Sequence, residues 1–512
     1  MSSIFQFGTR WLVFSVACIA NITIVGAQER TGLPSRPDDI EFPKLEYKPP
    51  TTEGMRLVLK NGSAVWWAKD EGIGTLPGLF RLSALVRAST LQDPVDKVGL
   101  TDFAVSMMRE GGTKNYLRDE LNLQLDRRAA TIDTEATEDF VTLTLTCLDV
   151  DKEVGLRLFD DVLRRPAFAQ AEVARVQSMR IQSLKQRNLL PSDVEEREWN
   201  RLLYGSGHPF GRSPTAKTLA ALTRDDLEAW HKARCVPSGV CFFGSGSLAA
   251  DAASELLNGV FGDWTSEVRA EPIAVATAVT SVAPGIYLMP REQEAAHVRI
   301  GLLGYRRENE DYFPLLVMNN ILGGGSFSSR ITQSVRVRNG LSYVSYSGID
   351  MQEYFEGSIF GVAQTANRTA AFAARLILDE FKRIRDEDVS DDELKAAREA
   401  LIGSFPQRFA SRYAIARTFA QSEYFGRPAD FHETWRSRIE SVSAKDVKRV
   451  ARKYLNPDNL VIYMLGRVDD IKAGNPDDGE RTTTLKQLHR KVFVAPLPEP
   501  ENLTAADIEA QD

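Results

Sequence analysis

The sequence predicts a mixed α/β protein built from two similar halves, and three observations point to that fold class. The chain has 512 residues, which is enough for two or more domains. Helix-like and strand-like patterns alternate along it. Residues 222–248 and 442–468 each read as a capped helix, a proline turn and an apolar strand that ends in glycine. A repeat at this distance indicates a duplicated domain rather than a solenoid of short units.

A constant offset of 220 residues separates the matching positions of the two segments. The matches are an acidic residue, a proline and the closing glycine: Asp226 with Asp446, Pro237 with Pro457, and Gly246 with Gly466. We therefore assign residues 51–265 to a first half, 266–284 to a linker and 285–468 to a second half.

Local patterns predict the elements of each half. In the first half, a turn at Asn61-Gly62 joins two apolar runs within 55–69, which indicates a hairpin. The other predicted elements of this half are strands at 79–87 and 140–148 and helices at 99–113, 116–128, 154–163 and 170–186. The second half has predicted strands at 297–305, 341–349 and 357–364 and helices at 314–322 and 328–338. The glycine triplet at 323–325 lacks the GxxxxGKS pattern of a phosphate loop, so we expect no nucleotide site there.

The two ends of the chain differ from the halves. Arg10 precedes an apolar run at 11–27 that closes with a small-residue cleavage pattern, so 1–27 is a predicted signal peptide. We expect secretion across the inner membrane into the periplasm, and no stable membrane insertion after cleavage. The alternative is an uncleaved anchor, although the run is short for a membrane span. Residues 28–50 are a predicted extended lead-in, and 469–512 a polar tail lying on a partner or on the body of the protein.

Charge and cysteine content narrow the class of protein. The net charge of −7 is mild and disfavours a general nucleic-acid binder. Signal cleavage would leave Cys147, Cys235 and Cys241, which is too few for a disulfide framework. Cys235 and Cys241 either form one bridge or remain buried thiols. The five histidines show no short metal-ligand spacing, and no CxxC pair is present.

The helix predicted at 99–113 carries the most informative pattern. Its expected buried face consists of Leu100, Phe103, Ala104, Met107 and Met108, at the spacing of one helix face. Its expected opposite face mixes residue types: Asp102, Val105, Ser106 and Arg109. Gly111-Gly112 is predicted to close the helix in a left-handed conformation.

This stretch resembles the metal-binding segment of the pitrilysin-type zinc peptidases, a family that includes insulinase and the mitochondrial processing peptidase. The family usually has Gly-Leu-Ala-His-Phe-Leu-Glu-His-Met before a Gly-Thr; here residues 99–107 read GLTDFAVSM before Gly112-Thr113. The resemblance covers roughly 57–466. It implies that each half is a mostly antiparallel sheet packed with helices, and that the halves are arranged like a clam shell.

The resemblance also implies that this chain lacks the family's chemistry. In the His-x-x-Glu-His pattern, two histidines bind zinc and the glutamate activates water. Asp102 and Ser106 stand in place of the histidines, and Val105 in place of the glutamate. Ser183 stands where the family has a further glutamate ligand. Because valine cannot transfer a proton and serine is a weak ligand, we expect no catalytic residue and no metal site in this chain.

The second half keeps a different part of the pattern. Residues 328–346 read SSRITQSVRVRNGLSYVSY and resemble a family stretch in which an arginine precedes a tyrosine by seven residues. By that resemblance, Arg336 and Tyr343 contact the carbonyl groups of a peptide substrate, which suits their hydrogen-bond donors. The sheet edge within 130–148 resembles the family strand to which a peptide adds as an extra strand.

These features lead to one principal hypothesis and two alternatives. The principal hypothesis is a non-catalytic, substrate-binding subunit of a secreted heterodimeric zinc metallopeptidase. A homologous catalytic chain would supply the zinc, and this chain would supply Arg336, Tyr343 and half of the chamber. The first alternative is a structural or assembly protein of the same fold with no peptidase role. The second is an active homodimeric peptidase with an unorthodox metal site.

Overall fold

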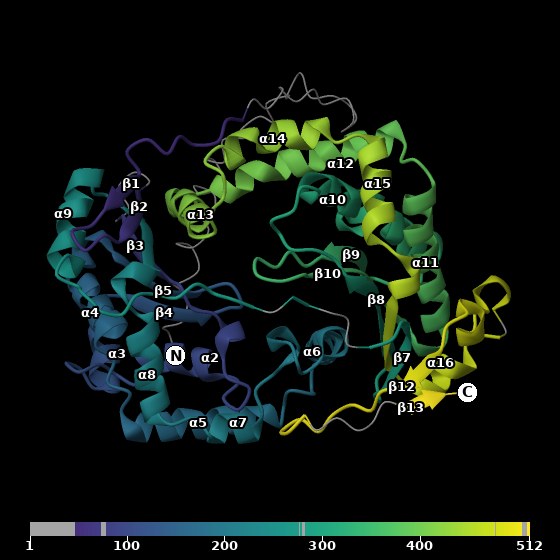
Figure 1. The fold of residues 1–512 in the computed structure, drawn as a ribbon, viewed down its shortest axis with the longest axis horizontal. Helices are drawn as coiled ribbons and strands as arrows, with labels where there is room; N and C mark the ends of the chain where they lie inside the picture. Colours follow the sequence, from purple (N-terminus) through teal and green to yellow (C-terminus); the bar gives the residue numbers. More distant parts are fainter. Residues whose placement is uncertain are drawn as a thin grey trace, which may run out of the picture. The chain divides into compact units, whose positions relative to one another are not determined.

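Each half of the chain folds around one sheet covered by helices (Figure 1). The computed structural model describes residues 47–72, 78–275, 277–278, 282–476, 478–503 and 509–511. The predicted signal peptide and most of the lead-in lie outside these residues. Pro49–Asp512, which contains both halves and the predicted linker, forms one compact unit. Within the described residues, no helix has the length and apolar character needed to cross a membrane.

The first sheet has six strands in the order β1-β2-β6-β3-β5-β4. Only β2 and β6 run parallel; every other neighbouring pair is antiparallel. The strands are β1 (Arg56–Val58), β2 (Ala64–Lys69), β3 (Leu79–Val86), β4 (Thr131–Ala136), β5 (Val141–Leu148) and β6 (Val240–Gly246). The predicted strand at 140–148 therefore lies inside the sheet, and β4 forms its edge.

The second sheet has seven strands in the order β13-β12-β7-β11-β8-β10-β9. They are β7 (Gly285–Pro290), β8 (Ala295–Leu303), β9 (Ser345–Ile349), β10 (Ser358–Ala366), β11 (Val461–Gly466), β12 (Val492–Val494) and β13 (Glu509–Gln511). The run β7-β11-β8-β10-β9 repeats β2-β6-β3-β5-β4 with the same sense at every pair. This shared topology confirms the two homologous halves.

Helices complete both halves. Those of the first are α2 (Leu100–Glu110), α3 (Arg118–Asp126), α4 (Lys152–Arg164), α5 (Gln170–Leu184), α6 (Pro191–Tyr204), α7 (Ala216–Ala220), α8 (Arg224–Arg234) and α9 (Ala250–Phe261). Those of the second are α10 (Tyr312–Asn319), α11 (Ala370–Asp386), α12 (Asp391–Ser404), α13 (Arg412–Tyr424), α14 (Phe431–Ser441), α15 (Ala444–Tyr454) and α16 (Val468–Ala473). In the first half α4 packs on β5; in the second, α11 packs on β8 and β10 (Figure 1).

The duplicated segments begin with the same capping arrangement. Thr223 Oγ1 accepts a hydrogen bond from the Asp226 backbone N–H at 3.2 Å, and Ser443 Oγ accepts one from Asp446 N–H at the same distance. In return, each aspartate carboxylate accepts a bond from the backbone N–H of its cap residue. These reciprocal bonds satisfy N–H groups that a helix start leaves unpaired, which explains the paired acidic residues of α8 and α15.

One helix of each half packs on the other half's sheet. Trp199 of α6 is fully buried in a core shared with second-sheet residues such as Tyr287 and Tyr463. His297 of β8 donates from Nδ1 to the Glu195 carboxylate of α6 at 2.7 Å. The sequence places α6 in the first half, but its apolar and acidic groups contact the second sheet.

The reciprocal helix is α13. Phe419 stacks on Trp66 of β2 with ring centroids 5.6 Å apart, and the Tyr413 hydroxyl lies 2.6 Å from Ser83 Oγ. Tyr204 and Tyr424, which end α6 and α13, are separated by the offset of the duplication. The halves therefore exchange equivalent helices, and this exchange interlocks them.

Two strands differ from the sequence prediction, whereas the tail and two of the cysteines bear on alternatives that it left open. The second half opens with β7, a buried strand ahead of the predicted one at 297–305. The strand predicted from residue 341 begins at Ser345, because 342–344 form a turn. The polar tail contributes α16 and β12, where Phe493 stacks on Tyr287 at 4.7 Å, so this part of the tail lies on the body of the protein. Cys235 and Cys241 are free thiols.

Candidate functional site

Both ends of α2 are fixed by specific backbone contacts. At its start, the Asp93 carboxylate accepts bonds from Gly99 N–H at 2.9 Å and from Thr101 N–H at 3.0 Å. Burial of Asp93 raises the pKa of its carboxyl to about 6. At its end, Gly112 has a φ of +70°, which confirms the predicted left-handed closure.

The faces of α2 are only partly as predicted. All five predicted core residues are buried, but Val105, expected on the opposite face, is also buried at 1% exposure. The reason is that α2 packs against β4 on one side and α8 on another. Of the three positions where the resemblance places a ligand or base, only Asp102 and Ser106 reach the accessible side.

Arg180 of α5 contacts both of these residues. Its Nη1 forms an ion pair with the Asp102 carboxylate, and its Nη2 donates to Ser106 Oγ at 2.8 Å. Its guanidinium carbon lies 5.3 Å from the centre of the Phe103 ring. Ser183 is exposed, and its hydroxyl donates to the Arg180 carbonyl on its own helix at 2.7 Å. The residue that α5 brings to α2 is therefore Arg180, which our sequence reasoning missed, and not Ser183.

The groups at this position do not fit a zinc ion. One carboxylate, one hydroxyl and one guanidinium face one another, whereas zinc sites use imidazole, thiolate and carboxylate donors. The fixed positive charge of Arg180 would repel a divalent cation. Within the described part of the chain, no cluster of three or more His, Cys, Asp or Glu side chains is placed to hold a metal. We therefore derive no metal-dependent step from these residues.

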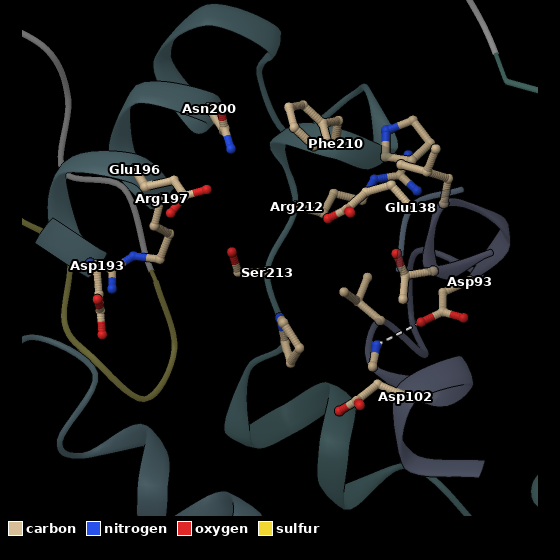
Figure 2. A pocket seen from close by; sticks show the side chains of 16 residues that line it. Asp93, Asp102, Glu138, Asp193, Glu196, Arg197, Asn200, Phe210, Arg212 and Ser213 are labelled. Atoms are coloured by element: carbon tan, nitrogen blue, oxygen red, sulfur yellow. Dashed lines mark hydrogen bonds between the residues drawn. The ribbon is translucent and has the colours of Figure 1, made fainter. Parts of the chain in front are cut away.

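A pocket of about 350 Å³ lies beside the start of α2. Figure 2 shows Asp193, Glu196 and Asn200 of α6 on one side of it and Asp93 and Asp102 on another. Its two guanidiniums are engaged by the chain's own oxygens: that of Arg197 by Glu198 and Asn188, and that of Arg212 by the Ser206 and Gly207 carbonyls. The lining is consequently acidic and disfavours anionic ligands.

The predicted pair in the second half does come together. Arg336 lies in η8 (Thr332–Arg338), a π-helical segment, and its Nη1 donates to the Tyr343 carbonyl at 3.1 Å. The guanidinium carbon is 5.7 Å from the Tyr343 ring centre and 4.5 Å from that of Phe327. The Tyr343 side chain is 89% exposed. A guanidinium has five N–H donors and this contact uses one, so others remain for a ligand.

A groove of about 520 Å³ runs beside this pair along β9. Its other wall is η6 (Asn320–Gly324), a second π-helical segment; such segments are rare and frequently occur at functional sites. Gly323 allows η6 to approach β9 closely, because a Cβ there would lie 2.2 Å from the Ser347 nitrogen. Within the described residues β9 pairs only with β10, and its other edge is contacted by η6 and η8, since Thr332 Oγ1 donates to the Ser345 carbonyl at 2.9 Å.

The first sheet has a comparable edge. Among the residues described, β4 pairs only with β5, and its side chains alternate between exposed and more buried positions. The sequence prediction of a peptide-accepting edge within 130–148 thus falls on β4. That a peptide adds to β4 as an extra strand stays a prediction.

Comparisons with known proteins point to one family. A family model described as "Peptidase M16 inactive domain" matches residues 221–401. An uncharacterized zinc protease of Mycobacterium bovis is 26% identical over 314 residues, covering 60% of this chain and 70% of that protein. A non-peptidase homolog of Helicobacter pylori is 21% identical over 375 residues, covering 72% and 85%. A crystal structure of a peptidase M16 inactive domain from Pseudomonas fluorescens superimposes with a TM-score of 0.71 at 23% identity, covering 80% and 98%.

Proposed function

Because this chain belongs to the pitrilysin-like (M16) family of zinc peptidases and their homologues, we propose that it is a non-catalytic subunit that binds peptide for a zinc-bearing homologous chain. The observation that carries the proposal is the pair of half-buried Arg336 and exposed Tyr343 beside the groove along β9. The residues that the resemblance assigns to substrate contact are kept in the sequence, whereas those that it assigns to the metal are replaced.

The contribution of this chain is to bind and orient an extended peptide. Backbone groups of an edge strand form ladder hydrogen bonds with the peptide main chain. The remaining N–H groups of Arg336 donate to a peptide carbonyl, and the exposed Tyr343 hydroxyl supplies another donor. The partner would supply the zinc and the general base, since Val105 cannot move a proton and Asp102 is held by Arg180.

The proposal includes a cellular location. The predicted signal at 1–27 supports secretion across the inner membrane and a periplasmic heterodimer. Cell fractionation followed by N-terminal sequencing of the mature protein would test it. A mature chain that starts after Ala27 in the periplasmic fraction is expected, and an intact N-terminus in the cytoplasm would contradict this part.

The first experiment compares this chain alone with a mixture that contains its zinc-bearing homologue. We expect no zinc-dependent cleavage of a quenched fluorescent peptide by this chain alone, and cleavage by the mixture above that of the homologue alone. Strong zinc-dependent activity from the isolated chain would contradict the proposal. Co-purification only with membrane proteins that are not peptidases would favour the assembly-protein alternative.

The second experiment removes the guanidinium. Arg336→Ala in the mixture should lower kcat/KM about tenfold, because a lost hydrogen bond from a charged donor costs about 1.5 kcal/mol. Arg338→Ala is the matched control, since Arg338 lies on the same segment but pairs with Glu380 at 3.4 Å. Equal kcat/KM values for the wild type and the Arg336 variant would rule out the substrate-contact role.

A further inference from the structure

We infer that the Arg180 guanidinium stands in the position of the missing metal and braces α2 against α5, so that this chain keeps the helix pair assembled without zinc. The inference rests on the proposed correspondence between α2 and the family's metal-binding helix. It does not depend on peptide binding by Arg336 and Tyr343, so either proposal can fail alone.

Arg180 joins α5 to two residues of α2, as a metal ion bound between these helices would. Asp102 and Ser106 are four residues apart and therefore lie on one side of α2, one turn from each other. One nitrogen of the guanidinium contacts the Asp102 carboxylate and another lies 2.8 Å from Ser106 Oγ. A planar fork of donors on a side chain that stays charged at any physiological pH can hold two acceptors in this way.

The surroundings keep the guanidinium in place. The guanidinium carbon of Arg180 lies over the Phe103 ring, 5.3 Å from the ring centre. The Arg180 side chain is 25% exposed. A second ion pair, between Arg175 of α5 and Glu110 of α2 at 3.5 Å, joins the same helices near the other end of α2. Arg180 thus belongs to a set of cationic contacts between these two helices and is its most enclosed member.

Arg180 contacts α2, whereas Ser183, the position found by counting along the sequence, does not. Ser183 lies three residues further along α5, is exposed, and bonds to its own helix. A metal ligand placed at 180 would face α2, whereas one placed at 183 would not. This difference can be tested directly by building two metal sites that differ only in the third ligand.

The test compares zinc content in three full-length proteins. The wild type should retain less than about 0.1 zinc per chain after dialysis, and added zinc should leave its Tm unchanged. Asp102→His/Ser106→His/Arg180→Glu should bind about one zinc per chain, because it presents two imidazoles and a carboxylate. Its Tm should fall on addition of EDTA. Asp102→His/Ser106→His/Ser183→Glu, the matched control, should bind no stoichiometric zinc.

Several outcomes would overturn the inference: stoichiometric zinc in the wild type, equal zinc in the two triple variants, or no zinc in a folded Arg180→Glu triple variant. If that variant does not fold, thermal melts of single variants decide. The Tm losses of Asp102→Ala and Arg180→Ala should overlap, so that the double variant loses no more than Arg180→Ala alone. Additive losses would show that Arg180 does not act through Asp102. Lys185→Ala, which removes an exposed charge directly after α5 without an ion pair to α2 among the described residues, serves as the control.

Discussion

The two halves of this molecule share a five-strand core and differ where function is expected. Both place one parallel pair and three antiparallel pairs in the same order, and both start the equivalent helices α8 and α15 with a reciprocal cap. The contacts that fold the half are therefore present twice. The groups that carry chemistry are not, since α2 in the first half carries an ion pair and η8 in the second carries Arg336, which donates to the Tyr343 carbonyl.

The sheet edges differ in the same way. In the first half, the hairpin strand β1 pairs antiparallel to β2. In the second half, the corresponding place beside β7 is taken by β12, which comes from the C-terminal tail and runs parallel. Outer strands contribute fewer ladder bonds than central ones, so their origin is free to differ while the central order is kept.

The largest expected effect tests the helix exchange. Trp199→Ala should cost about 3–5 kcal/mol of the free energy of unfolding, because a fully buried indole is lost from the contact of α6 with the second sheet. Phe419→Ala should have a similar effect on the contact of α13 with β2. Urea denaturation followed by circular dichroism checks both. We expect one cooperative transition that moves to lower urea in each variant.

The Trp199→Ala prediction has a control variant and an outcome that would contradict it. Val150→Ala removes a side chain that is 83% exposed and should change stability by less than about 0.5 kcal/mol. Two separate transitions, of which Trp199→Ala moves only one, would mean that the halves unfold independently. The interlocking described above would then not govern the stability of the chain.

The next effect concerns the stability of the fold at low pH. Burial, with Arg408 and Arg427 nearby, lowers the pKa of His432 to about 4 from a usual 6.5. The unfolded chain therefore binds more protons between these values, and stability should fall as the pH falls from about 6.5 to about 4. Once the pH is well below 4, this lowered pKa reduces the free energy of unfolding by about 3 kcal/mol. Urea denaturation at several pH values, compared between wild type and His432→Gln, measures it.

Two carboxyls of the first half stabilise the folded state as the pH falls, which is opposite to the effect of His432. The effect of His432 must therefore be measured as the difference between the wild type and the variant. Burial raises the pKa of Asp93 and of Asp139 to about 6, so the folded state binds more protons there and gains stability as the pH falls through that value. The difference between wild type and His432→Gln removes both contributions. An identical pH dependence in the two proteins would show that folding does not lower the pKa of His432.

The parts of the molecule that the sequence predicted are those with a local signal. The core face of α2, the paired caps of α8 and α15 and the spacing of Arg336 and Tyr343 all appear within a few turns of chain. In each case, the side chains involved meet because of helix or turn geometry. Such contacts need no knowledge of the rest of the fold.

The parts that the sequence did not predict depend on distant contacts. Val105 is buried because α2 touches both β4 and α8, which a one-sided apolar pattern does not encode. Arg180, and not Ser183, contacts α2, and its partner Asp102 lies 78 positions earlier in the sequence, so no local pattern predicts the contact. The pairing of α6 with the second sheet and the short strand β12 likewise have no local signature.

The smallest effect compares the duplicated caps directly. Thr223→Ala and Ser443→Ala each remove the side-chain acceptor of an Asp N–H at 3.2 Å, and each should cost about 1 kcal/mol. Because the caps occupy equivalent places, the two losses should agree within about 0.5 kcal/mol and add in the double variant. Urea denaturation checks this, with Ser441→Ala, outside the cap, as the control. A clearly larger loss at Thr223 would point to Lys97, which pairs closely with Asp226, whereas the ion pair of Asp446 is a longer one with Arg449 at 3.7 Å on its own helix. In that case the first half would depend on its cap through a closer ion pair than that of the second half, and the duplicated caps would not be energetically equivalent.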